Sequence, residues 1–173
     1  LLGLDYPKSA IDALFDSWDP DRSGQLELTE LNKQLRKTAV IGCIKLAMVS
    51  HDAVFGTDLV DTLYKMLRDR DPQVVANCIV ALDEILKAEG GMVINKQIIH
   101  HLLNRMKEFN EWSQCVVLEM VARYKPETQQ ETFDVMNLLE ERLKHSNSAV
   151  VLAATKVFLQ LTQDMPAVHS QVY

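Results

Sequence analysis

Apolar residues in the last two thirds of the chain recur with the spacing of an α-helix. In segment 72–87 they stand at i, i+4, i+7, i+8 and i+11, which forms one continuous face at about 3.6 residues per turn. Segments 111–124 and 148–161 have the same spacing. Each of the three follows another amphipathic segment, at 57–71, 95–110 and 130–147. The pattern predicts three helix pairs.

The three pairs repeat one another. Asp71, Asn110 and Asn147 lie 39 and 37 residues apart, each at the start of a second helix, where Asp or Asn can accept a hydrogen bond from unpaired amides. In this register the second helices share five columns, apolar except at Ser113: Val74, Ser113, Val150; Cys78, Val117, Ala154; Ala81, Met120, Val157; Leu82, Val121, Phe158; Ile85, Tyr124, Leu161. The first helices share two: Leu63, Leu102, Leu139 and Leu67, Met106, Leu143. Repeating helix pairs of this length are typical of a HEAT/armadillo-like α-solenoid, in which neighbouring pairs cover each other's apolar faces.

The same register extends towards the N-terminus. The residues that lie 39 positions before the first member of each column are Leu35, Ala39, Gly42, Cys43 and Leu46, all apolar or small. Segment 31–48 is therefore predicted to be the second helix of an earlier repeat, with these residues in its core. The first helix of that repeat should lie where residues 19–30 stand, but the sequence there has a different character.

Residues 19–30, DPDRSGQLELTE, have the spacing of an EF-hand calcium loop. Oxygen-bearing side chains occupy loop positions 1, 3, 5, 9 and 12, and the backbone carbonyl of position 7 adds a ligand: Asp19, Asp21, Ser23, Glu27, Glu30 and the carbonyl of Gln25. Gly24 stands at position 6, where a positive φ is needed. Ca²⁺ prefers six to eight hard oxygen ligands, so the loop is predicted to bind one Ca²⁺.

Amphipathic segments flank the loop. Ile11, Leu14, Phe15 and Trp18 form an apolar face before it, and Leu28, Leu31 and Leu35 form one after it. Residues 1–37 are accordingly predicted to be an EF-hand and residues 38–173 a partial set of helical repeats. The alternative reading of the loop is a solvated acidic turn. EF-hands usually work as pairs, and the sequence contains no second loop.

Composition narrows the function classes. The chain has 173 residues, a formal net charge of −6, and basic residues interspersed with acidic ones, which argues against nucleic-acid binding. No apolar run is long enough for a transmembrane segment. Cys43, Cys78 and Cys115 stand singly and are predicted to be buried reduced thiols. The sequence shows no nucleophile–base pair, phosphate loop or metal-activated water site, so an enzyme is not predicted.

Segments 36–46, 68–106 and 145–161 resemble successive repeats in the N-terminal trunk of beta-adaptins, the large subunits of vesicle-coat adaptor complexes. The stretch EILKAEGGMVINKQIIHHLLNRM, residues 84–106, is most similar to the beta subunit of the fourth adaptor complex. The resemblance covers about residues 36–173. It departs from the family before Arg36, where beta-adaptins have a trunk helix and no metal loop. A natural fusion, a splice form and a gene-model artefact would each produce this junction.

The resemblance implies an all-α scaffold in vesicle-mediated intracellular protein transport. The implied partners are the second large, medium and small chains of an adaptor complex, with peripheral membrane association through that complex. The implied location is cytoplasmic, on Golgi, trans-Golgi network or endosomal coat membranes. The alternative is a calcium-responsive interaction module whose solenoid binds a non-coat partner.

Overall fold

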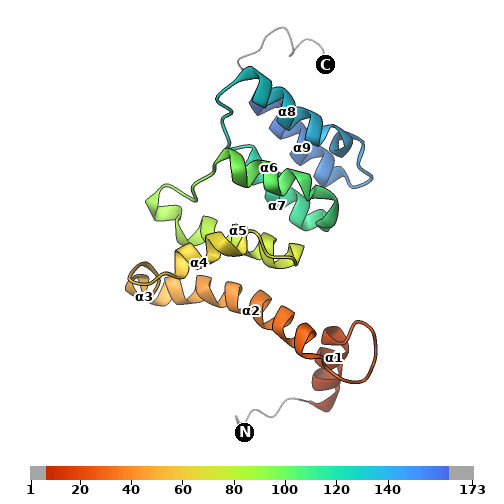
Figure 1. Cartoon of the computed structure of the whole chain (residues 1–173). Helices are drawn as coiled ribbons and strands as arrows, with labels where there is room; N and C mark the ends of the chain where they lie inside the picture. Colours follow the sequence, from red (N-terminus) through yellow and green to blue (C-terminus); the bar gives the residue numbers. More distant parts are fainter. Residues whose placement is uncertain (1–6, 164–173) are drawn as a thin grey trace.

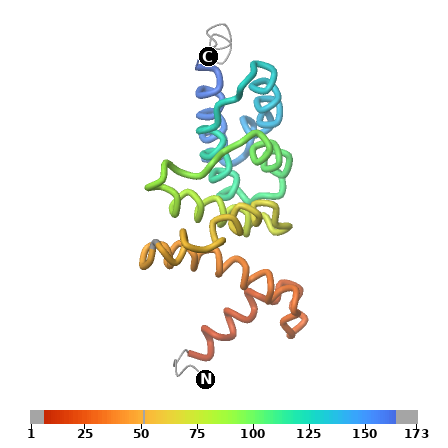
Figure 2. The backbone as a smooth tube through the Cα atoms, turned by 60° about the vertical axis from the view of Figure 1, so that its left-hand side comes forward, coloured from red at the N-terminus to blue at the C-terminus, as the bar shows by residue number. Residues whose placement is uncertain are grey.

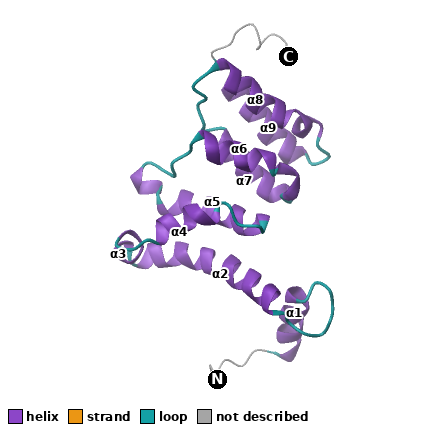
Figure 3. Ribbon diagram, in the orientation of Figure 1, coloured by secondary structure: helices purple, strands orange, loops and turns teal. Residues whose placement is uncertain are grey.

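The computed structural model describes residues 7–163, which fold into helices joined by short turns (Figure 1). The α-helices are α1 (Lys8–Trp18), α2 (Leu28–Val49), α3 (His51–Phe55), α4 (Leu59–Met66), α5 (Pro72–Ile85), α6 (Lys96–Asn104), α7 (Glu111–Val121), α8 (Gln129–Leu139) and α9 (Ser148–Thr162). Three short 3₁₀ helices lie at Lys87–Glu89 (η1), Met106–Glu108 (η2) and Glu140–Lys144 (η3). No strand occurs between residues 7 and 163 (Figure 3), so the all-α prediction is confirmed for this range. The last ten residues of the predicted repeat region lie outside it.

The three predicted helix pairs are α4–α5, α6–α7 and α8–α9, and the predicted caps start each second helix. Asp71 Oδ1 accepts from the amide of Gln73 at 2.8 Å, and Asn110 Oδ1 accepts from that of Ser113 at 2.8 Å. Asn147 Oδ1 accepts from the amide of Ala149 at 2.9 Å. The side chains therefore satisfy amides that have no partner within the helix.

The aligned columns form the core. Every residue of the five second-helix columns is buried, at 9% exposure or less. The first helices end earlier than predicted, because the chain tightens into a turn before each cap. Leu67, Met106 and Leu143 lie in these turns and still face the core, although Leu143 is only partly buried. Successive second helices pack on one another, α5 on α7 and α7 on α9, which produces the stack seen in Figure 1.

Helix α2 takes the place of a second helix at one end of this stack. It packs against α5, and Val40, only 1% exposed, lies in the shared core. The prediction of which face of α2 is buried is wrong, however. Leu35 is 56% exposed and Leu46 is 43% exposed. Ala39 and Gly42 are exposed as well, and Cys43 is partly buried.

The position of α1 explains the exposure. In the later repeats the first helix of each pair packs against its second helix: α4 on α5, α6 on α7 and α8 on α9. Before α2 the chain instead forms α1 and a loop, and α1 has no buried residue. Figures 1 and 2 both show α1 projecting from the end of the stack. Its own apolar residues Ile11 and Leu14 are 55% and 52% exposed.

Among the helices of residues 7–163, none is both long enough and apolar enough to cross a lipid bilayer.

Candidate functional site

The acidic loop lies between the end of α1 at Trp18 and the start of α2 at Leu28. The amide of Glu27 donates to Glu30 Oε2 at 3.0 Å, which fixes the first turn of α2. Gly24 has a φ of 78°, as predicted for position 6. A Cβ at Gly24 would meet nothing within 4 Å, so the left-handed backbone and not a lack of space favours glycine here.

Most of the predicted calcium ligands converge. Carboxylate oxygens of Asp19, Asp21 and Glu30 all lie within 4.8 Å of one another. The Ser23 hydroxyl lies 2.9 Å from the carbonyl oxygen of Gln25 and 3.4 Å from Asp19 Oδ1. The loop therefore gathers oxygens from positions 1, 3, 5, 7 and 12. Glu27, the position-9 residue, is engaged elsewhere, since its carboxylate accepts from the Thr29 hydroxyl at 3.3 Å.

Asp19 is the anchor of the loop and is only 4% exposed. Its two carboxylate oxygens accept from the amides of Ser23 at 3.1 Å and Gly24 at 2.8 Å. Burial by itself would raise the pKa of Asp19, but the hydrogen bonds with Asp21, Gly24 and Ser23 lower it below its ordinary value. The carboxyl is thus held in its charged form.

Arg22 lies within the loop, but no basic side chain of the described residues forms an ion pair with the loop carboxylates Asp19, Asp21 and Glu30. Three carboxylates that converge without a compensating cation repel one another. An all-oxygen set of this kind suits a hard cation such as Ca²⁺, so the ligand set fits the predicted ion. Calcium binding itself stays a prediction.

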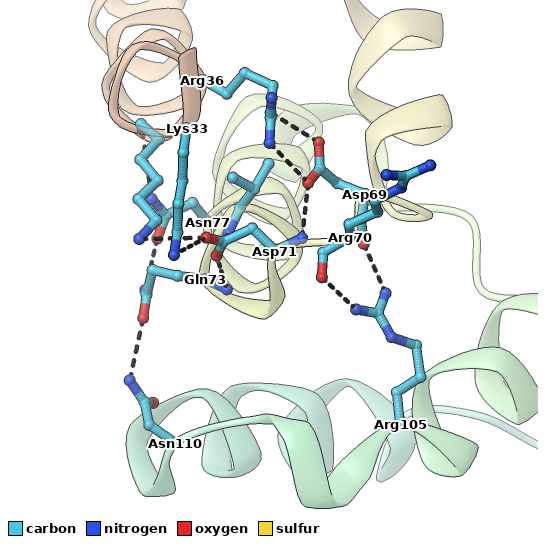
Figure 4. Close-up of polar contacts among 11 residues, drawn as sticks. Lys33, Arg36, Asp69, Arg70, Asp71, Gln73, Asn77, Arg105 and Asn110 are labelled. Atoms are coloured by element: carbon cyan, nitrogen blue, oxygen red, sulfur yellow. Dashed lines mark hydrogen bonds and ion pairs between the residues drawn. The ribbon is translucent and has the colours of Figure 1, made fainter. Parts of the chain in front are cut away.

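A second group of polar contacts joins α2 to the first complete repeat (Figure 4). Lys33 Nζ lies 3.1 Å and Lys37 Nζ 3.5 Å from Asp71 Oδ2, while Asp71 Oδ1 caps α5. Arg36 Nε lies 3.0 Å from Asp69 Oδ2, beside this pair. Asp71 is thus a cap and an ion-pair partner together.

Similar polar contacts cross the later joints. Asn110 Nδ2 donates to Gln73 Oε1 at 3.1 Å (Figure 4), and Asn147 Nδ2 donates to Glu111 Oε2 at 2.8 Å. Each cap asparagine therefore serves its own helix through its oxygen and the preceding repeat through its nitrogen. The sequence predicted only the first role, because Gln73 and Glu111 occupy different register positions and form no column.

One column of these contacts could have been found from the sequence. Arg105 and Arg142 are 37 residues apart, the period of the caps. Arg105 donates to the backbone carbonyls of Asp69 at 2.7 Å and Arg70 at 3.0 Å, and Arg142 donates to Gln114 Oε1 at 3.4 Å. Both guanidinium groups thus reach back to the preceding repeat.

The cap register also shows how the loop and the stack are connected. Asn32 lies 39 residues before Asp71, yet it sits inside α2 and accepts from Arg36 at 2.5 Å. Helix α2 starts four residues earlier, at Leu28. The helix that leaves the acidic loop and the helix that packs on α5 are therefore one uninterrupted helix of 22 residues.

Comparison with known proteins places these helices in a family. The model described as non-SMC mitotic condensation complex subunit 1 matches residues 25–160. AP-4 complex subunit beta-1 of Mus musculus is 49% identical over 138 residues, which are 80% of this chain and 19% of that protein. Beta-adaptin-like protein A of Arabidopsis thaliana is 46% identical over 157 residues, 84% of this chain and 19% of that protein. AP-4 complex subunit beta of Dictyostelium discoideum is 40% identical over 146 residues, 84% of this chain and 17% of that protein.

The chain spans about a fifth of the length of these curated relatives. The family model covers residues 25–160, which include the stacked helix pairs from α4 to α9 except the end of α9. The chain belongs to the helical-repeat family that the condensation-subunit model describes, and it is a homologue of the beta-adaptins.

Proposed function

We propose that this chain is a scaffold segment of a beta-type adaptor-complex subunit in vesicle-mediated protein transport. The observation that carries the proposal is the 49% identity over 138 residues to a protein named as an AP-4 complex subunit. This pairwise likeness is more specific than the family model, so an adaptor role is favoured over one in chromosome condensation. Relatives named as complex subunits also favour a structural role over an enzymatic one.

The proposed partners are the second large, medium and small chains of the complex. Through them the chain would be held on the cytoplasmic side of Golgi, trans-Golgi network or endosomal coat membranes. Two relatives carry the AP-4 name, which supports the fourth adaptor complex as the assembly. The stack is suited to holding partners, because each repeat buries one side against its neighbours and leaves turns and outer faces for contact.

Immunoprecipitation of the tagged chain from mammalian cells tests this proposal. We expect the medium and small chains of the fourth complex to be recovered. The control is a Leu82→Asp variant, which places an unpaired charge in the core and should lose the partners with the fold. Recovery of chains from another adaptor complex would refute the assignment to the fourth. Recovery of no adaptor chain by a folded protein would refute the scaffold role.

We also propose that the loop of residues 19–30 binds one Ca²⁺ through Asp19, Asp21, Ser23, Glu30 and the carbonyl of Gln25, with Glu27 at position 9. The convergence of the three carboxylates within 4.8 Å supports this. The ion would stiffen the start of α2. This leads to the alternative function, a calcium-responsive module whose repeats bind a non-coat partner.

Calorimetric titration with CaCl₂ tests the calcium proposal. Glu30→Gln removes one converging carboxylate charge, and Glu140→Gln, on the exposed turn η3, removes the same charge elsewhere. We expect one binding event in the wild type and in Glu140→Gln, and at least tenfold weaker binding in Glu30→Gln. Equal heats in all three would identify the loop as an acidic turn. Calcium-dependent recovery of non-adaptor proteins would favour the alternative function.

A further inference from the structure

We propose that the edge of the stack where α4 ends is a docking groove for an acidic peptide. Two recesses meet there. The first, of about 360 Å³, lies between α4 and α6, and its lining includes Lys65, Arg68, Asn95, Gln97, Ile98 and His101. The second, of about 570 Å³, lies between α2 and the turn that follows α4 and is lined by Leu28, Thr29, Asn32, Arg36, Arg68, Asp69 and Arg70. Arg68 borders both, so the two recesses are neighbours, and together they are called here the basic groove.

The charge of the basic groove is opposite to that of the whole chain, whose formal net charge is −6. Lys65, Arg68 and Arg70 are exposed, and within residues 7–163 none of them forms an ion pair. The one carboxylate in the lining is Asp69. Arg36 and the amide of Asp71 already bind it, at 3.0 Å and 2.8 Å. The groove therefore presents three cations without an internal counterion.

The first recess adds groups that favour an anion. Asn95 caps the N-terminus of α6 and lines the recess with Gln97, so the partial positive charge of that helix end lies beside Lys65 and Arg68. His101 Nε2 is buried and has no hydrogen-bond partner within the described residues. Burial and the nearby Arg105 and Arg68 lower the pKa of His101, so its ring is neutral at pH 7. The ring of His101 lines the recess, so a carboxylate bound there would lie beside the ring and change its electrostatic environment.

The remaining lining favours a peptide over a flat anionic surface. The cations stand around recesses between helices, where a flexible chain can enter and a bilayer cannot. Side-chain amides of Gln97 and Asn32 can bond a peptide backbone, and Ile98 and Leu28 offer apolar contact. Arginine guanidinium groups suit peptide carboxylates because they can bind both oxygens at once. The groove thus fits an extended segment rich in Glu or Asp with interspersed apolar side chains.

Fluorescence anisotropy tests the proposal. The probe is a fluorescein-labelled nonapeptide with five glutamates, two leucines and two serines, and its control has glutamines in place of the glutamates. The variant Lys65→Gln/Arg68→Gln removes two groove cations. The matched control Lys125→Gln/Lys156→Gln removes two exposed lysines elsewhere on the stack. We expect the groove variant to bind the acidic probe at least tenfold more weakly, the control variant to change less than twofold, and the glutamine probe not to bind.

Two further readouts locate the site and identify the ligand class. In NMR spectra, the ring signals of His101 should shift with the acidic probe while those of His145, on the turn before α9, stay in place. Equal loss of binding in both double variants, or unmoved His101 signals, would overturn the groove assignment. Vesicles with 30% phosphatidylserine are the competing ligand. Vesicle binding that depends on Lys65 and Arg68, without probe binding, would overturn the peptide in favour of a membrane. Matching thermal melts of all variants establish that folding is unchanged.

Discussion

Lys33 Nζ lies 3.1 Å from Asp71 Oδ2, and this ion pair joins the helix that leaves the acidic loop to the cap of the first complete repeat. Asp71 is only 8% exposed, so its charge depends on protein partners more than on water. The amides of Gln73 and Val74 bind its other oxygen at 2.8 Å and 3.3 Å. The Asp71 side chain thus links α2 to α5 and also caps the first turn of α5. Substitutions of Asp71 therefore report directly on the stability of this joint.

Replacing Asp71 separates its cap role from its ion-pair role. Asp71→Ala removes both, and we expect the free energy of unfolding to fall by about 1–3 kcal/mol, because helix amides and lysines lose their acceptor. Asp71→Asn keeps an oxygen for the amides and should cost less. Urea unfolding measures both losses against Glu140→Gln as a surface control. Equal losses for Ala and Asn would mean that the cap contributes nothing.

The same joint should weaken in acid. Burial alone would raise the pKa of Asp71, but Lys33, the amide of Gln73 and Lys37 together lower it below its ordinary value of 3.8. A carboxyl with a lowered folded-state pKa contributes stability above its unfolded-state pKa and loses it as the pH falls through the folded-state value. The stability difference between the wild type and Asp71→Asn should therefore shrink below about pH 4. Urea titrations at pH 7, 4 and 3 measure it, and a difference that grows in acid would contradict the assignment.

Core and uncovered columns should respond differently to the same truncation. Leu82 is 0% exposed, and Leu82→Ala should cost about 2–5 kcal/mol through lost burial and a cavity. Leu46, which lies one register step before Ile85 in a neighbouring column, is 43% exposed, and Leu46→Ala should cost about 0.5 kcal/mol or less. Thermal and urea melts give both values. A large loss at Leu46 would show that this face of α2 is covered in solution.

Calcium should stabilise the chain by an amount that grows with the logarithm of its affinity. For a dissociation constant of about 10⁻⁵ M, near the weak end of the sensor range, 1 mM Ca²⁺ adds about 2.7 kcal/mol to the free energy of unfolding. Glu30→Gln should lose most of this gain, and Glu140→Gln should keep it. The measurement is urea unfolding with 1 mM CaCl₂ or 1 mM EDTA. Identical curves in the two buffers would exclude a site of this strength.

The three cysteines should differ in reactivity. Burial, with smaller effects of Asp69 and Cys43, raises the pKa of Cys78 to about 12. Its thiolate is therefore almost absent at pH 8, and attack on a disulfide reagent needs the thiolate. Cys43 and Cys115 are partly buried, so we expect them to react first with Ellman's reagent in the folded chain. Cys78 should react only on unfolding in urea, and early labelling of Cys78, identified by mass spectrometry, would contradict this.

The sequence predicted the parts of the fold that recur. Val74, Val117 and Phe158 repeat with the caps, so their burial could be derived from spacing alone. Leu35 and Leu46 matched the same columns but are exposed, because burial depends on a covering helix that a column cannot reveal. The loop could be recognised because Asp19, Asp21 and Glu30 have to be spaced for one ion. The contacts of Gln73 with Asn110 and of Arg36 with Asp69 join residues 37 and 33 positions apart with no repeating partner, so only the folded structure brings them to light.

Helix α2 runs without a break through Asn32, so it connects the acidic loop rigidly to the stack, where its C-terminal half is anchored. From Leu28, beside the loop, to Val40, held in the core against α5, the helix spans about 18 Å at about 1.5 Å per residue. A displacement of about 3 Å at the loop end then corresponds to a rotation of only about 10° at Val40. The stack can follow such a rotation with small shifts of its side chains. Movement at the loop therefore reaches the repeats as a small rotation of α2. The ion pairs of Lys33 and Lys37 with Asp71 oppose this rotation.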